Sequence, residues 1–191
     1  MTTVYTGIGS RDTPLAIQER MSWLAADLAS DGWTLRSGAA TGADTAFALG
    51  AGATEIYVPW QTFGAGTPGD RILATELPTF GAAMEIAAEH HRAWNQLTNG
   101  AQLLMARNVF QVLGRDLHSP SAMVICWAPK PILDEDGDVC SVAGGTGQAV
   151  RIAYTYGIPV YHFDLHADAI ERFGAEARAP NRGLLAAVGM R

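Results

Sequence analysis

Residues 3–11 read Thr-Val-Tyr-Thr-Gly-Ile-Gly-Ser-Arg, a strand-like run of β-branched and aromatic residues that ends in a glycine turn. Two more glycine turns follow hydrophobic runs, at residues 37–44 (SGAATGAD) and 144–148 (GGTGQ). Each turn leads directly, or within a few residues, into a helix-like segment. A repeated order of strand, turn and helix is typical of an α/β fold. We therefore predict a Rossmann-like, mostly parallel sheet with helices on both faces.

The three turns also indicate a function. A glycine turn lets the backbone approach a ligand, and the N-terminus of the next helix offers free N–H groups to an anion. Carboxyl ends of parallel strands meet at one edge of the sheet, so the turns should line one site. We expect a nucleotide or a nucleotide-derived phosphate there. The candidate binding residues on the turns are Gly9, Ser10, Arg11, Ser37, Gly38, Thr41, Gly42, Gly144, Gly145, Thr146, Gly147 and Gln148.

The hydrophobic pattern predicts the remaining organisation. Strands are expected near residues 3–7, 33–37, 55–59, 122–127 and 160–163, and helices near 13–30, 42–50, 80–97, 100–113, 147–156 and 166–173. We predict one nucleotide-binding domain over residues 1–173 and a C-terminal tail over 174–191. Residues 60–78 form a long connection, which is either functional or mobile. Residues 129–142 form an acidic loop, either solvated or metal-binding.

Composition limits the classes of function. The chain has 191 residues and a net charge of −6, which argues against nucleic acid as a partner because nucleic-acid surfaces are normally basic. No apolar run reaches about 18 residues, so we expect no membrane span, and without a signal peptide we expect a cytoplasmic protein. Two cysteines, Cys126 and Cys140, cannot form a disulfide framework. The histidines and cysteines show no metal-ligand spacing, and we predict neither metal nor cofactor.

Three residues outside or beside the glycines are candidates for direct roles. Arg107 and Gln111 lie four residues apart and share a helix face within an apolar stretch, so Arg107 anchors either a phosphate or a structural ion pair. Asp44 either caps a helix or acts on the ligand as a hydrogen-bond acceptor or general base. Trp127 ends a predicted strand, where it either packs or stacks on a base.

These motifs carry a family resemblance. Residues 7–11, 37–44, 106–108 and 144–147 resemble the superfamily of Lonely Guy phosphoribohydrolases and the DNA-processing protein A domain, and most of all its small, often phage-encoded members. Residues 37–44 resemble the Ser-Gly-x-Ala-x-Gly-x-Asp pattern of the DNA-processing branch. Arg107 and the third turn resemble the Met-x-x-Arg-Lys and Pro-Gly-Gly-x-Gly-Thr-x-x-Glu motifs of the Lonely Guy branch.

The resemblance implies a Rossmann-like fold, a nucleotide-sized ligand and a homodimer. Enzymes of the Lonely Guy branch cleave the N-glycosidic bond of a nucleoside 5′-monophosphate. Here Asn108, a further candidate binding residue, replaces the motif lysine, and Val150 stands where the first motif glutamate would fall. Another carboxylate would then have to stabilise the developing oxocarbenium ion, and Asp44 is preferred over Glu85 because Asp44 lies on a glycine turn.

Three functions follow as hypotheses. The first is an enzyme that cleaves or transfers at the N-glycosidic bond of a nucleotide, with Asp44 and Arg107 as catalytic residues. The second is a binding protein without catalysis that senses or sequesters a nucleotide signal, for example in conflict between phage and host. The third is a DNA-associated accessory protein.

Overall fold

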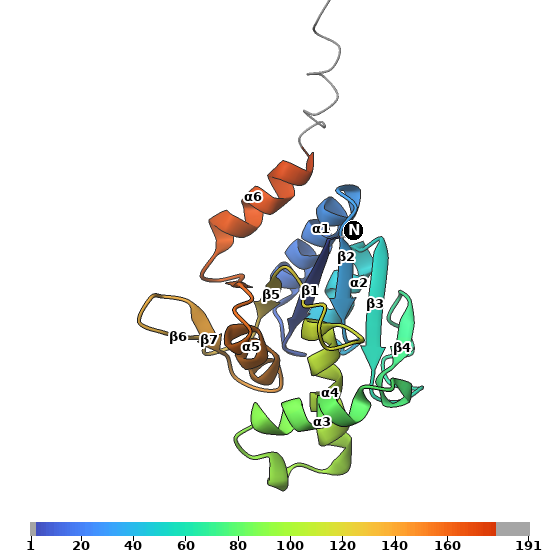
Figure 1. The fold of residues 1–191 in the computed structure, drawn as a ribbon. Helices are drawn as coiled ribbons and strands as arrows, with labels where there is room; N and C mark the ends of the chain where they lie inside the picture. Colours follow the sequence, from blue (N-terminus) through green and yellow to red (C-terminus); the bar gives the residue numbers. More distant parts are fainter. Residues whose placement is uncertain (1–2, 179–191) are drawn as a thin grey trace, which may run out of the picture.

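A six-stranded parallel sheet forms the centre of the protein (Figure 1). The computed structural model describes residues 3–178. The strands lie in the order β4-β3-β2-β1-β5-β8, and every neighbouring pair is parallel. Their bounds are β1 Val4–Gly9, β2 Thr34–Ser37, β3 Ala53–Val58, β4 Arg71–Leu73, β5 Val124–Trp127 and β8 Val160–His162. The predicted Rossmann-like sheet is confirmed.

Helices cover both faces of the sheet, as the sequence predicted. One face carries α1 (Leu15–Ser30), α2 (Ala43–Gly50) and α6 (Ala167–Arg178), and the other carries α3 (Phe80–Glu89), α4 (Asn99–Leu113) and α5 (Thr146–Thr155). Short 3₁₀ turns, η1 (Ala74–Glu76) and η2 (Trp94–Gln96), flank α3. Among the described residues, no helix is both long enough and apolar enough to cross a membrane.

Strand β5 shows why the sequence folds into two layers of core. Val124 and Cys126 pack into the cluster under α4 and α5, while Ile125 packs into the cluster under α1 and α2. A strand that is buried on both faces has a continuous apolar sequence rather than an alternating one, and residues 122–127 have such a sequence. Burial on both faces therefore suits β5 to an interior position in the sheet, between β1 and β8.

The structure contains elements that the sequence pattern did not reveal. Strand β4 lies within the predicted 60–78 connection, and an antiparallel hairpin of β6 (Ile132–Leu133) and β7 (Val139–Ser141) lies within the predicted acidic loop. These strands have two or three residues each, which is too short for a periodic signal. The helix predicted over 166–173 continues to Arg178 as α6, into the segment that we assigned to the tail. The rest of that tail lies outside the described residues.

The sheet order positions a site. Strand β1 lies between β2 and β5, and the helices that follow β1 and β5 pack on opposite faces of the sheet. The chain therefore diverges at the carboxyl ends of β1 and β5 and leaves a crevice between them. In open α/β sheets this crevice is where ligands bind.

Candidate functional site

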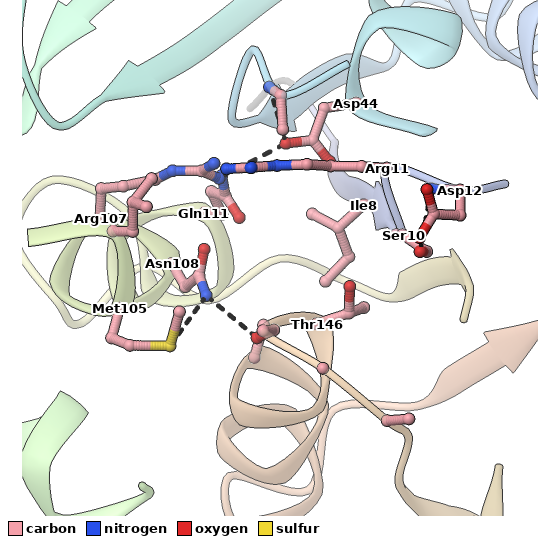
Figure 2. Close-up of a pocket in the computed structure, with 17 residues that line it drawn as sticks. Ile8, Ser10, Arg11, Asp12, Asp44, Met105, Arg107, Asn108, Gln111 and Thr146 are labelled. Carbon is pink, nitrogen blue, oxygen red and sulfur yellow. Dashed lines mark hydrogen bonds and ion pairs between the residues drawn. The ribbon is translucent and has the colours of Figure 1, made fainter. Parts of the chain in front are cut away.

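A cavity of about 280 Å³ occupies this crevice (Figure 2). Its walls come from the turn after β1, the turn between β2 and α2, the inner face of α4 and the start of α5. Ligand pockets have volumes of about 300–1,000 Å³, so this cavity is at the small end of the range. The three predicted glycine turns each contribute to its wall, as the sequence indicated.

The floor of the cavity holds a buried ion pair. Nη1 of Arg107 lies 3.5 Å from Oδ2 of Asp44, and these residues are only 5% and 3% exposed. The backbone N–H of Ala40 also donates to Oδ2, at 3.2 Å. Burial raises the pKa of Asp44, opposed by Arg107 and by the N–H groups of Ala40 and Gly9. Burial likewise lowers the pKa of Arg107, opposed by Asp44, so each partner favours the charged form of the other against the effect of burial.

Gly38 fixes the position of this arginine. A Cβ atom at Gly38 would overlap Nη1 of Arg107 and Nε2 of Gln111. On another side, the ring centroid of Phe63 lies 5.5 Å from Cζ of Arg107. The guanidinium is therefore confined by the glycine backbone and an aromatic ring. This close approach explains why the second turn needs a glycine at this position, although its φ is not in the left-handed region.

A second guanidinium faces the first. Figure 2 shows Arg11 and Arg107 pointing toward one another above Gln111, from opposite walls of the cavity. Arg11 also lowers the pKa of Arg107, as expected for like charges at close range. Of the two carboxylates that line the cavity, Asp44 is buried beside Arg107 and Asp12 is exposed. An anion between the two guanidinium groups would stabilise them, because guanidinium groups bind phosphate or carboxylate with paired hydrogen bonds.

The start of α5 supplies hydrogen-bond donors from a further wall of the cavity. Gly144 has a φ of +75°, which a glycine adopts without strain, and it turns the chain into the helix. Within the described part of the chain, the N–H groups of Gly144, Gly145 and Thr146 make no hydrogen bond. The side-chain amide of Asn108 donates to the carbonyl of Gly145 at 3.3 Å and to Oε1 of Gln148 at 3.0 Å. Asn108 thus fastens this turn to α4.

Several buried polar atoms around the cavity lack a partner among the described residues: Nε of Arg107, both polar side-chain atoms of Gln111, and Nε2 of Gln148. Buried polar groups are usually hydrogen-bonded, so such a group needs an explanation. Gln111 was not among our candidate residues, although its spacing of four from Arg107 was the signal for it. Asp12, Leu104 and Met105 also line the cavity and were not among our candidates, although Leu104 and Met105 lie within the Met-x-x-Arg-Lys motif when it is aligned on Arg107.

The structure does not bring every candidate residue to the cavity. Trp127 lies outside its wall, and its indole N–H donates to Oδ2 of Asp164 at 2.8 Å. The hydroxyl of Ser37 is buried and donates to the carbonyl of Gly7 at 2.6 Å, which links β2 to β1. Thr41 and Gly42 line a separate surface groove between α1 and α2.

Two further candidates lie directly behind the cavity wall. A Cβ atom at Gly147 would overlap the carbonyl oxygen of Val142, so this glycine allows the close packing of the turn. Gln148 is fully buried and contacts Asn108 rather than the cavity. Glu85 is exposed on α3 and is not part of the wall, which leaves Asp44 as the buried carboxylate in it.

Fold and cavity together define a Rossmann-like α/β protein with a cavity at the carboxyl edge of its sheet, lined by charged and amide side chains among apolar ones. No protein-family model matches the chain, and no curated protein matches its sequence. Among solved structures, it is similar to DNA processing protein A from Helicobacter pylori, with a TM-score of 0.49 and 19% identity over 84% of this chain and 64% of that one.

DNA processing protein A from Streptococcus pneumoniae also matches, with a TM-score of 0.46 and 15% identity over 92% of this chain and 56% of that one. The chain therefore spans less than two thirds of either protein. At these identities the likeness concerns the fold alone. Both matches belong to the DNA-processing branch whose motifs the sequence resembles, whereas the homodimer and the relation to phage proteins stay predictions.

One expectation has to be corrected. The Helicobacter pylori structure is described for its single-stranded DNA binding mode, which contradicts our prediction that nucleic acid is an unlikely partner. The physical reason is that net charge sums over the whole surface. A net charge of −6 says nothing of the charge inside one cavity, where Arg11 and Arg107 converge.

Proposed function

We propose that the cavity binds a nucleoside monophosphate unit, either as a free nucleotide or as the end of a single strand. The observation that carries this proposal is the convergence of Arg11 and Arg107 on one small cavity whose opposite wall is the start of α5. Helix N-termini with free N–H groups bind phosphate, and guanidinium groups add charge-assisted hydrogen bonds.

The size of the cavity supports a single nucleotide unit. At about 280 Å³ it leaves little room for a dinucleotide, so any further nucleotide would lie outside it. The phosphate would bind at the N–H groups of Gly144, Gly145 and Thr146, with Arg11 and Arg107 neutralising its charge. The ribose and base would then face Asn108 and Gln111. The amide oxygen of Asn108 can accept a hydrogen bond, and the unpartnered amide of Gln111 offers both a donor and an acceptor.

A second function, cleavage of the N-glycosidic bond, is favoured by the position of Asp44. Its buried carboxylate lines the cavity and forms an ion pair with Arg107. In such a reaction water adds to C1′ of the sugar and the base leaves with a proton, while the carboxylate stabilises the positive charge on the sugar. If no bond is cleaved, the same cavity would serve a protein that senses or sequesters a nucleotide.

Mass spectrometry distinguishes these functions. The protein is incubated with ribo- and deoxyribonucleoside monophosphates and with short 5′-phosphorylated strands, and both the solution and the native protein are analysed. Retention of an intact nucleotide supports binding alone. A free base plus a sugar phosphate supports cleavage, which Asp44→Asn should abolish while binding persists. No retention and no product from any of these compounds would contradict the proposal.

A further inference from the structure

A partly exposed tryptophan lies beside the cavity, where the connection after β3 passes the first turn of α4. Trp60 is 38% exposed, and its ring packs edge-on against Phe63 with centroids 5.3 Å apart. Gly100 lies next to the ring on α4, where even an added Cβ atom would be 4.0 Å from Cζ3 of Trp60. The ring is therefore partly covered by Phe63 and the first turn of α4 and partly open to solvent.

Two sets of contacts connect the ring of Trp60 to the wall of the cavity, one through α4 and one through Phe63. Gly100 and Leu104 are one helical turn apart on α4, which is about 6 Å, and Leu104 lines the cavity. Phe63 connects the same two places, since it contacts Trp60 on one side and the guanidinium of Arg107 on another. Along α4, the path from Leu104 to the ring is therefore one helical turn plus the 4.0 Å between the Gly100 position and Cζ3 of Trp60.

Hydrogen bonds hold the segment that carries the ring. The guanidinium of Arg71 donates to the carbonyls of Gln61 at 3.1 Å, Phe63 at 2.6 Å and Gly64 at 2.8 Å. The hydroxyl of Thr67 lies 3.1 Å from that of Thr45 on α2. We interpreted residues 60–78 as either a functional or a mobile segment, and these hydrogen bonds favour the functional one. The ring is presented at a fixed place beside the cavity.

We propose that Trp60 stacks on the base of the nucleotide next to the one in the cavity, so that the protein takes a single strand of at least two nucleotides. The inference rests on the proposed function, because the cavity must hold the first nucleotide. Aromatic side chains stack on bases of any identity, so the second position is read without sequence preference. The cavity alone would bind a free mononucleotide and a strand end equally well.

The test compares 5′-phosphorylated mono- and dinucleotides, as deoxyribo and ribo forms, by isothermal titration with the full chain. Stacking of one base contributes roughly tenfold or more in affinity, so the dinucleotide should bind about tenfold tighter than the mononucleotide. Trp60→Ala should remove this increment and leave the mononucleotide affinity unchanged. Trp60→Phe should keep most of it, which separates stacking from a change in folding.

Trp23 is the matched control, since it is 68% exposed on α1 and lies outside the cavity wall. Trp23→Ala should leave both affinities unchanged. Equal binding of the two ligands by the unmodified protein, or an increment that survives in Trp60→Ala, would overturn the inference while leaving the proposed function intact. Absence of mononucleotide binding would instead refute the proposed function, and the inference with it.

Discussion

Replacement of Gly38 by alanine tests the geometry of the buried ion pair. The added methyl group would occupy the space of Nη1 of Arg107 and Nε2 of Gln111, and Phe63 lies against the guanidinium on another side. Overpacking of a buried site costs about 1–3 kcal/mol, and loss of the pair with Asp44 would cost about 3–5 kcal/mol. We therefore expect Gly38→Ala to lower the free energy of unfolding by about 2–4 kcal/mol.

Thermal and urea unfolding, followed by circular dichroism, measure this change. For a domain of this size a loss of about 3 kcal/mol corresponds to a fall in Tm of roughly 6–12 °C. Gly81→Ala in α3 is the control, since an added Cβ there meets nothing within 4 Å. Alanine favours a helix over glycine by up to about 1 kcal/mol, so Gly81→Ala should be neutral or stabilising. An unchanged stability of Gly38→Ala would refute the confinement of Arg107.

Two smaller predictions concern the thiols and one exposed carboxylate. Burial raises the pKa of Cys126 to about 12, so a thiol reagent at neutral pH should modify only Cys140 in the native protein. After unfolding it should modify both cysteines. Two reactive thiols in the native state would show that the buried position of Cys126 in β5 is wrong. N–H donors of His118 and Ser119 and the Ser119 hydroxyl lower the pKa of Asp116, so its stabilising effect is present above the usual carboxyl pKa and is lost as the pH falls through the lowered value. Asp116→Asn should therefore have a lower free energy of unfolding than the unmodified protein at pH 7, and the same one at about pH 2. A difference between the two proteins that is the same at both pH values would contradict this.

The sequence predicted the fold because the strand, turn and helix order repeats along the chain, and each long element had a clear period. It also predicted that turns far apart in sequence meet at one edge, since this follows from parallel strands alone. Asp44 and Arg107 were identified by residue type and position. Their contact was not predictable, because it depends on how α4 crosses the turn that contains Gly38.

Strand parity explains the different position of Trp127. Alternate residues of a strand point to opposite faces, so Trp127 shares the α1 and α2 face with Ile125, whereas Cys126 faces α4 and α5. The cavity lies on the α4 and α5 side, which the sequence could not establish. Thr41 was misjudged for a related reason: the turn places it between α1 and α2, away from the cavity.

The most direct test of the central claim measures whether the cavity recognises phosphate. Isothermal titration compares a nucleoside 5′-monophosphate with the same nucleoside, for the unmodified protein, Arg11→Met and the surface control Arg20→Met. The account predicts that the monophosphate binds at least about tenfold tighter than the nucleoside, since one charge-assisted hydrogen bond contributes about 1.5–3 kcal/mol. Arg11→Met should lose the part of this difference that Arg11 contributes, and Arg20→Met should lose none. Equal affinity for both compounds, or a preference that is unchanged in Arg11→Met, would contradict the account.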